Sequence, residues 1–181
     1  MNRYGRSVLG CWFLLFLMEY GWTAPQDGFS LAVGGMAHAA HAQLVNDGLD
    51  RHFDSAGIAL YGDAQFVVSP KWSFNPYVLT GLEKAHGDVT QNIGNSSGGL
   101  QLRHWWNNCY LGANVNYSIE QIFKGGSVQS ATFGPGVGLN AGYETPAGLI
   151  LGLGVDFPQS LYLSPTNHRS GAWMVLGYRW H

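Results

Sequence analysis

Charged residues are scarce in this sequence. Asp, Glu, Lys and Arg make up 11% of its 181 residues, about half the share found in an ordinary soluble domain. The formal net charge is −2, which gives no indication of a nucleic-acid partner. Cysteine is scarce as well, since the chain has only Cys11, near its N-terminus, and Cys109. With Cys109 alone in the body of the chain, an internal disulfide and a cysteine-based metal site are excluded.

Long apolar runs are lacking after the N-terminus. The mean hydropathy is −0.04 although 46% of the residues are hydrophobic, which argues against a bundle of membrane helices. The one N-terminal run, from Val8 to Met18, follows Arg3 and Arg6, and the segment after it ends in the small residues Thr23 and Ala24. This order predicts a secretory signal peptide over residues 1–24. A retained membrane anchor is the alternative.

Glycine and aromatic residues, in contrast, are abundant. The chain has 26 glycines, and 14% of its residues are aromatic. In the segment Gly171–His181 one face is apolar and ends in two aromatics: Ala172, Met174, Leu176, Tyr178 and Trp180. Because side chains alternate across a strand, the two faces of this segment meet different environments. An apolar row that ends in aromatics is typical of a strand that faces lipid and stops at the membrane interface.

Eight segments alternate in this way and are predicted to be strands. They span residues 28–38, 55–68, 72–83, 98–106, 109–122, 128–144, 148–157 and 171–181. The connections between them are mostly long polar segments in alternation with tight turns. Because a sheet in lipid must close to satisfy its backbone, the predicted fold is all-β, an eight-stranded antiparallel up-and-down transmembrane β-barrel. It comprises residues 25–181, with both termini on the periplasmic side.

A soluble β-sandwich or lipocalin-like barrel is the alternative, and it would bury the aliphatic rows instead. Five aromatic residues at predicted strand ends argue against it. They are predicted to form an interfacial belt that consists of Trp72, Trp106, Tyr143, Tyr178 and Trp180. Pro76 falls inside the third predicted strand, where it cannot donate to the ladder. We therefore expect a local weakness or a bulge at this position.

The inward faces of the predicted strands contain charges of both signs among tyrosines, tryptophans and glycines. The predicted polar network of the lumen consists of Asp63, Glu83, Arg103, Glu120, Asp156 and Arg179. Side chains fill the interior of an eight-stranded barrel, and a charge buried there is tolerated only when it is paired. Asp63 and Arg103 both count to the periplasmic half, so they are expected to form an ion pair.

Two sets of titratable residues are candidates for further chemistry. His38, Glu83, Glu120 and Asp156 point inward near the outer strand ends, where they could form a cation site or an acid/base group. A polar plug that contains water is the preferred interpretation. The predicted outside loops also contain residue types that ligate metals: His38, His41, His52, His86, His168, Asp47, Asp50, Asp54 and Asp88. They show no short ligand spacing, so we predict solvated loop residues, with neither a metal nor a cofactor.

The last strand ends in Leu-Gly-Tyr-Arg-Trp, which resembles the C-terminal strand of bacterial outer-membrane β-barrels, where Gly-Tyr-Arg-Phe is common. With its eight predicted strands, the chain is similar to the small outer-membrane barrels of the OmpA transmembrane-domain and OmpX type. The resemblance implies that the barrel assembly machinery reads the last strand. It also implies that outer-membrane lipid and lipopolysaccharide surround the barrel.

Three functions follow from this resemblance. The first is a non-enzymatic barrel with a plugged polar lumen, which contributes to envelope integrity or presents its loops to an unknown ligand. The second is a lipid A-modifying deacylase or acyltransferase. The deacylases carry a His-x-Ser-Asn motif on the sixth strand, whereas His168-Arg169-Ser170 has only the first spacing and falls in a predicted loop; G-x-S-x-G is absent too. The third is a small pore, which bulky inward side chains disfavour.

Overall fold

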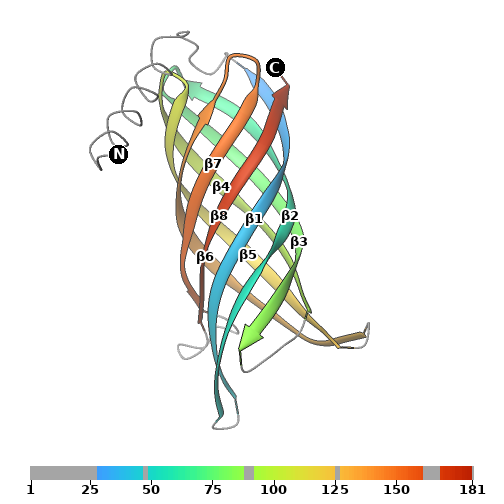
Figure 1. Cartoon of the computed structure of the whole chain (residues 1–181). Coiled ribbons are helices and arrows are strands. Elements are labelled where there is room, and N and C mark those ends of the chain that lie inside the picture. Colours follow the sequence, from blue (N-terminus) through green and yellow to red (C-terminus); the bar gives the residue numbers. More distant parts are fainter. Residues whose placement is uncertain (1–27, 47–48, 88–91, 125–126, 161–167, 181) are drawn as a thin grey trace, which may run out of the picture.

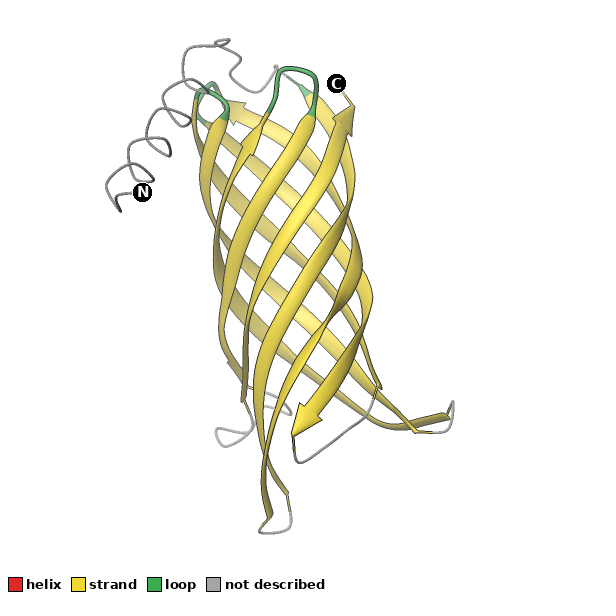
Figure 2. Cartoon of the chain, viewed as in Figure 1, coloured by secondary structure: helices red, strands yellow, loops and turns green. Residues whose placement is uncertain are grey.

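The computed structural model of the chain is an eight-stranded barrel, described over residues 28–46, 49–87, 92–124, 127–160 and 168–180 (Figures 1 and 2). The strands are β1 (Phe29–Asn46), β2 (Leu49–Ser69), β3 (Trp72–Gly87), β4 (Asn92–Trp106), β5 (Cys109–Lys124), β6 (Ser127–Glu144), β7 (Leu149–Ser160) and β8 (His168–Trp180). Each strand pairs antiparallel with its sequence neighbour, and β8 closes the barrel on β1. The predicted fold class is confirmed. Within the described ranges, no helix is long and apolar enough to cross a membrane.

The strands are strongly staggered. Phe29 of β1 has a paired residue on β2, which has its own paired residue on β3, and so on around the barrel. When this series is followed through all eight strands it arrives back on β1 at Ala39, ten residues beyond Phe29. Such a stagger accompanies the tilt that a closed barrel requires, and the tilt is visible in Figure 1. Closure gives every strand two neighbours, so the barrel has no open sheet edge.

The placement of apolar and polar side chains on the two faces of the barrel wall is the reverse of that in a soluble protein. On the outside, Ile58 and Leu60 are 75% and 67% exposed, and aliphatic side chains continue around the wall. On the inside, Arg179 is 0% exposed and most other buried polar side chains face the lumen. Water would not stabilise this arrangement, because burial of apolar surface is the main favourable term in folding. A lipid environment satisfies the outer face.

The strands extend further than predicted at one end of the barrel. Residues 39–54 were predicted to be a polar loop, but β1 and β2 remain paired through Asn46 and Leu49. Part of the predicted loop at residues 84–97 also belongs to strands, because β3 ends at Gly87 and β4 begins at Asn92. Beyond the apolar wall the pattern of the two faces changes: Phe53 and Ile93 are buried in an apolar cluster inside, while His41 and Asp54 are exposed outside. The ladder therefore continues without the apolar-outward alternation that marks a spanning strand.

Pro76 weakens one ladder without shifting its register. Asn75 and Pro76 of β3 have no paired residue on β2, but the residues before and after them are paired in the same register. The bulge in this pair lies between Val67 and Ser69, nearer the turn. Of the two expectations for Pro76, the local weakness is therefore the one that the structure shows.

Short turns join the strands at the end that contains the C-terminus of β8 (Figure 2). Positive φ values of 55° at Asn107 and 90° at Gly148 allow two of these turns, since Asn and Gly tolerate this backbone region best. The predicted signal peptide over residues 1–24 lies outside the described residues. So do residues 25–27, at the predicted start of the barrel domain.

Charge placed on the outer wall provides a test of the lipid-facing surface. Leu60→Arg, midway along β2, is expected to lower the free energy of unfolding by about 2 to 4 kcal/mol, because the cation would lie near the bilayer midplane. Val68→Arg is the matched control: it is similarly exposed at 69% but lies near the turn, where the cost is about 0 to 1 kcal/mol. Urea unfolding in lipid vesicles measures both. Equal losses would contradict the lipid-facing assignment.

Candidate functional site

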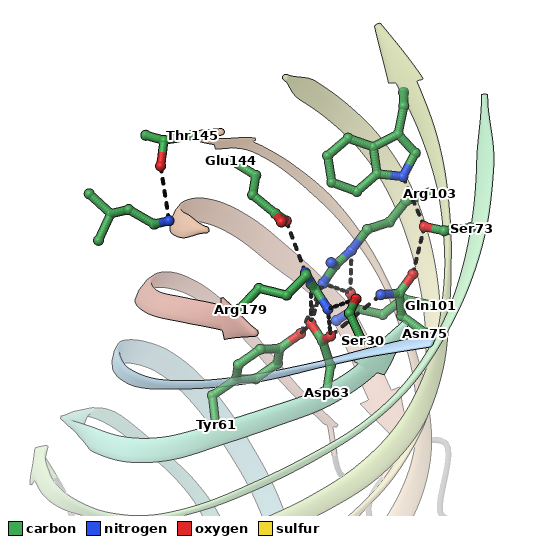
Figure 3. Close-up of polar contacts among 12 residues, drawn as sticks. Ser30, Tyr61, Asp63, Ser73, Asn75, Gln101, Arg103, Glu144, Thr145 and Arg179 are labelled. Atoms are coloured by element: carbon green, nitrogen blue, oxygen red, sulfur yellow. Dashed lines mark hydrogen bonds and ion pairs between the residues drawn. The ribbon is translucent and has the colours of Figure 1, made fainter. Parts of the chain in front are cut away.

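A buried polar network centred on Asp63 occupies the lumen near the short turns (Figure 3). Asp63 Oδ2 accepts hydrogen bonds from Arg103 Nη2 at 3.0 Å and from the Tyr61 hydroxyl at 2.6 Å. Asp63 Oδ1 accepts one from Arg179 Nη1 at 2.8 Å. The carboxylate thus joins strands β2, β4 and β8, and Arg103 and Asp63 lie together as the sequence suggested.

Each arginine of this network has further partners. Arg179 Nε donates to Glu144 at 3.0 Å. Arg103 donates to Gln101 through Nε and Nη2, and its guanidinium lies 4.5 Å from the centroid of the Tyr110 ring. The two carboxylates balance the two guanidinium groups, and all four side chains are at most 8% exposed. Such mutual pairing is the condition under which buried charges are tolerated.

A layer of bulky side chains separates this network from the opposite end of the lumen. Met36, Tyr61, Tyr77, Trp173 and Val175 pack together as one buried cluster. Gly154 provides space for the indole of Trp173, because a Cβ atom at this position would lie 2.2 Å from its ring. The layer therefore plugs the barrel.

A second polar cluster lies beyond the plug, toward the extended strand ends. Glu83 accepts hydrogen bonds from Ser55 Oγ at 2.7 Å and from Arg169 Nη2 at 2.5 Å, and its Oε1 contacts His38 Nδ1 at 3.0 Å. Arg169 also forms an ion pair with Glu120. The structure thus brings together three of the four inward residues considered for a cation or acid/base site. Arg169 occupies the position between the two glutamates, which disfavours a bound cation there.

Asp156 is the fourth of these residues and stands apart from Arg169. It forms no ion pair within the described part of the chain, and Trp173 and Asn114 are its neighbours. Together with His38, Glu83 and Glu120, it lines a cavity of about 40 Å³. This volume holds a few water molecules, whereas sites for drug-sized ligands measure roughly 300 to 1,000 Å³.

Several buried polar atoms next to this cavity indicate where water would bind. Asn95 Oδ1 and Ser97 Oγ have no hydrogen-bond partner within the described residues, and both residues line the cavity. Buried polar groups in proteins are rarely left without a partner. Water molecules in the cavity would supply these partners, as the interpretation of a polar plug that contains water expects.

The predicted belt residues lie together around the short-turn end. Trp72, Trp106, Tyr178 and Trp180 are 42% to 56% exposed on the outer wall. Tyr143 is less exposed, and its hydroxyl accepts a hydrogen bond from Asn108 at 3.4 Å. His104 of β4 lies among them, and its ring lies 4.6 Å from that of Trp72 and 4.3 Å from that of Trp106. An amphipathic ring between two tryptophans suits a membrane interface.

Two charged residues of the lumen were missed by the sequence analysis. Glu144 lies at the end of β6 beside a turn, and Arg169 was assigned to a loop although β8 begins at His168. The signal that could have found Arg169 is charge balance, because Glu83, Glu120 and Asp156 had no predicted cation at their end of the lumen.

These features define a class: a small, closed eight-stranded barrel with an apolar wall and a plugged polar lumen. No family model and no curated protein match the chain. Among solved structures it is similar to Ail, the attachment invasion locus protein of Yersinia pestis, with a TM-score of 0.55, 12% identity and coverage of 86% of this chain and 100% of Ail. It is also similar to Neisserial surface protein A, with a TM-score of 0.54, 19% identity and coverage of 84% and 98%. The chain therefore has the fold of the small eight-stranded outer-membrane barrels.

Proposed function

We propose that the chain is an integral protein of the bacterial outer membrane that contributes to envelope integrity and presents its extended strand ends outside the cell. The observation that carries this proposal is the inverted wall, with aliphatic side chains outside and paired charges inside. Lipid and lipopolysaccharide then surround the wall. The barrel assembly machinery inserts the chain through its last strand.

The orientation proposed for the barrel follows from its two ends. Outer-membrane barrels have short periplasmic turns and longer extracellular connections. The turns after β2, β4 and β6 are short, whereas the β1–β2 hairpin continues well past the apolar part of the wall. We therefore place the short turns and both termini in the periplasm, and the hairpin outside, where it is available to a ligand.

Cysteine labelling tests this orientation. Cys109 is exposed at the start of β5, next to the short turn after β4, so a membrane-impermeant maleimide should not label it in intact cells. Labelling should appear after the outer membrane is permeabilised. The matched variant, His52→Cys with Cys109→Ser, carries its thiol on the extended hairpin and should label in intact cells. The reverse pattern would show that the barrel is inserted the other way.

The plugged lumen predicts the absence of pore activity. Folded protein in planar bilayers is expected to give no large, stable conductance, because Tyr77 and Trp173 are both at most 9% exposed and close the interior. Heat-modifiable migration in detergent should show first that the preparation is folded. Steady conductance from folded protein would reject the plugged lumen and favour the pore.

A further inference from the structure

The outer wall has a row of polar side chains at the level where the apolar surface ends. The strand registers place Ser170 of β8 opposite His41 of β1, His41 opposite Asp54 of β2, and Asp54 opposite His86 of β3. Paired residues in antiparallel strands have Cβ atoms about 4.5 to 5.5 Å apart. One row thus brings a serine, a histidine and an aspartate together, although more than 100 residues separate Ser170 from the other two.

The histidine and aspartate of this row are already in contact. His41 Nδ1 lies 2.8 Å from Asp54 Oδ1, which leaves the Nε2 atom of His41 for another partner. Their side chains are 54% and 81% exposed, and Ser170 is half-buried. A serine beside a histidine that a carboxylate orients is the arrangement that activates a hydroxyl nucleophile. Contacts between nucleophile and base are often loose until substrate binds.

A shallow groove begins at this row and runs toward the apolar wall. It measures about 520 Å³ and is lined by Ser170, His41, Asp54, Ala39 and Ala56 among others. The alanines lie one row nearer the lipid and are followed by bulky outward residues such as Ile58. Small side chains between a polar row and an aliphatic wall leave room for an acyl chain beside the serine.

A cationic side chain lies next to this groove. Lys84 of β3 pairs with Ala56, which lines the groove, and both residues line an adjoining groove that continues along Ile58 and Leu82. An ammonium group at the level of the lipid headgroups favours an anionic lipid. Within the described residues, no group of three or more His, Cys, Asp or Glu side chains could hold a metal ion.

We propose that Ser170, His41 and Asp54 form a hydrolytic site on the outer wall of the barrel, which cleaves an acyl ester of an anionic lipid in the surrounding leaflet. This activity goes beyond the envelope role proposed above. It rests on the lipid-facing wall, and the orientation decides only which leaflet supplies the substrate.

The reaction has two steps and uses water as its co-reactant. Ser170 Oγ attacks the ester carbonyl carbon while His41 Nε2 takes the hydroxyl proton, and Asp54 stabilises the resulting imidazolium. The carbon–oxygen bond to the lipid alcohol breaks, and His41 returns the proton to the departing oxygen. Water then attacks the acyl-serine with His41 as base, which releases the fatty acid and restores the Ser170 hydroxyl. The balance is one ester and one water converted to one acid and one alcohol.

Fatty-acid release from vesicles tests the site. Folded full-length protein is reconstituted into phosphatidylglycerol vesicles in one arm and lipopolysaccharide-containing vesicles in the other, and the free acid is quantified. Release in either arm is expected, and the arms identify the lipid source. Ser170→Ala should reduce release to background, and His41→Ala and Asp54→Asn should each reduce it by about 10² to 10⁴ fold. Ser96→Ala, an exposed hydroxyl elsewhere on the outer wall, should leave the rate unchanged.

A fluorophosphonate probe gives an independent measurement. Peptide mass analysis should find the adduct on Ser170 in the wild type and on no other serine, and His41→Ala should not be labelled. Wild-type protein that releases no acid in either arm, or Ser170→Ala that retains the wild-type rate, would overturn the proposal. Because these assays do not depend on how the barrel is inserted in cells, their failure is distinguishable from a failed orientation test.

Discussion

Asp63→Ala is expected to lower the free energy of unfolding by about 3 to 5 kcal/mol, the cost of breaking a buried ion pair by removing one partner. The substitution leaves Arg103 without its carboxylate, while Arg179 keeps the carboxylate of Glu144. Both guanidinium groups are at most 2% exposed, so water cannot replace the lost partner without entry into the plugged lumen.

Urea unfolding in lipid vesicles measures this loss, and Asp54→Ala is the control. Asp54 is an exposed aspartate on the same strand, so its replacement should change the free energy of unfolding by no more than about 0.5 kcal/mol. If the two variants unfold at the same urea concentration, the ion pairs of Asp63 do not stabilise the barrel.

Arg169→Ala is expected to have a comparable effect at the other end of the lumen, with a loss of about 3 to 5 kcal/mol. The arginine is the shared cation of Glu83 and Glu120, whose side chains are 3% and 5% exposed. Its removal leaves two carboxylates close together, and Glu83 then has no arginine or lysine partner within the described residues.

Two variants bracket this expectation in the same urea assay. Arg169→Lys retains a positive charge, so it should lower the free energy of unfolding by less than Arg169→Ala. Some loss is still expected, because an ammonium group lacks the planar, two-pronged donor geometry of a guanidinium. Lys84→Ala, next to Glu83 but on the outer wall, should stay within about 0.5 kcal/mol of the wild type. If Arg169→Ala loses no more stability than Lys84→Ala, the ion pairs of Arg169 with Glu83 and Glu120 contribute nothing to the free energy of unfolding.

The faces of the strands were predictable from the sequence because lipid and lumen impose opposite requirements on alternate residues. In β5, for example, Leu111 and Val115 are exposed on the wall while Asn114 and Ser118 are buried. The same rule placed Asp63, Arg103 and Arg179 in the lumen. Strand ends were less predictable, because the rule stops where the outward residues become polar, as at His41 and Asp54 of the β1–β2 hairpin.

The partners of each lumen residue could not be predicted, because they depend on the stagger of the whole barrel. Arg179 follows Asp63 by 116 residues, and no local pattern connects them. The row of Ser170, His41 and Asp54 has the same origin, since it exists only when β8 closes on β1. Local spacing found the residue types and the faces, and the register decided which residues meet.

The position of Arg179 in the last strand bears on the sequence of events during assembly. The first seven strands carry Asp63, Glu144 and Arg103 of the Asp63 network, which is one cation too few. Only the docking of β8 supplies the missing charge, and the same step joins the last strand to the first. A sheet of seven strands in lipid therefore has two open edges and an uncompensated negative charge. Docking of β8 pairs the open edges and supplies the missing positive charge in the same step.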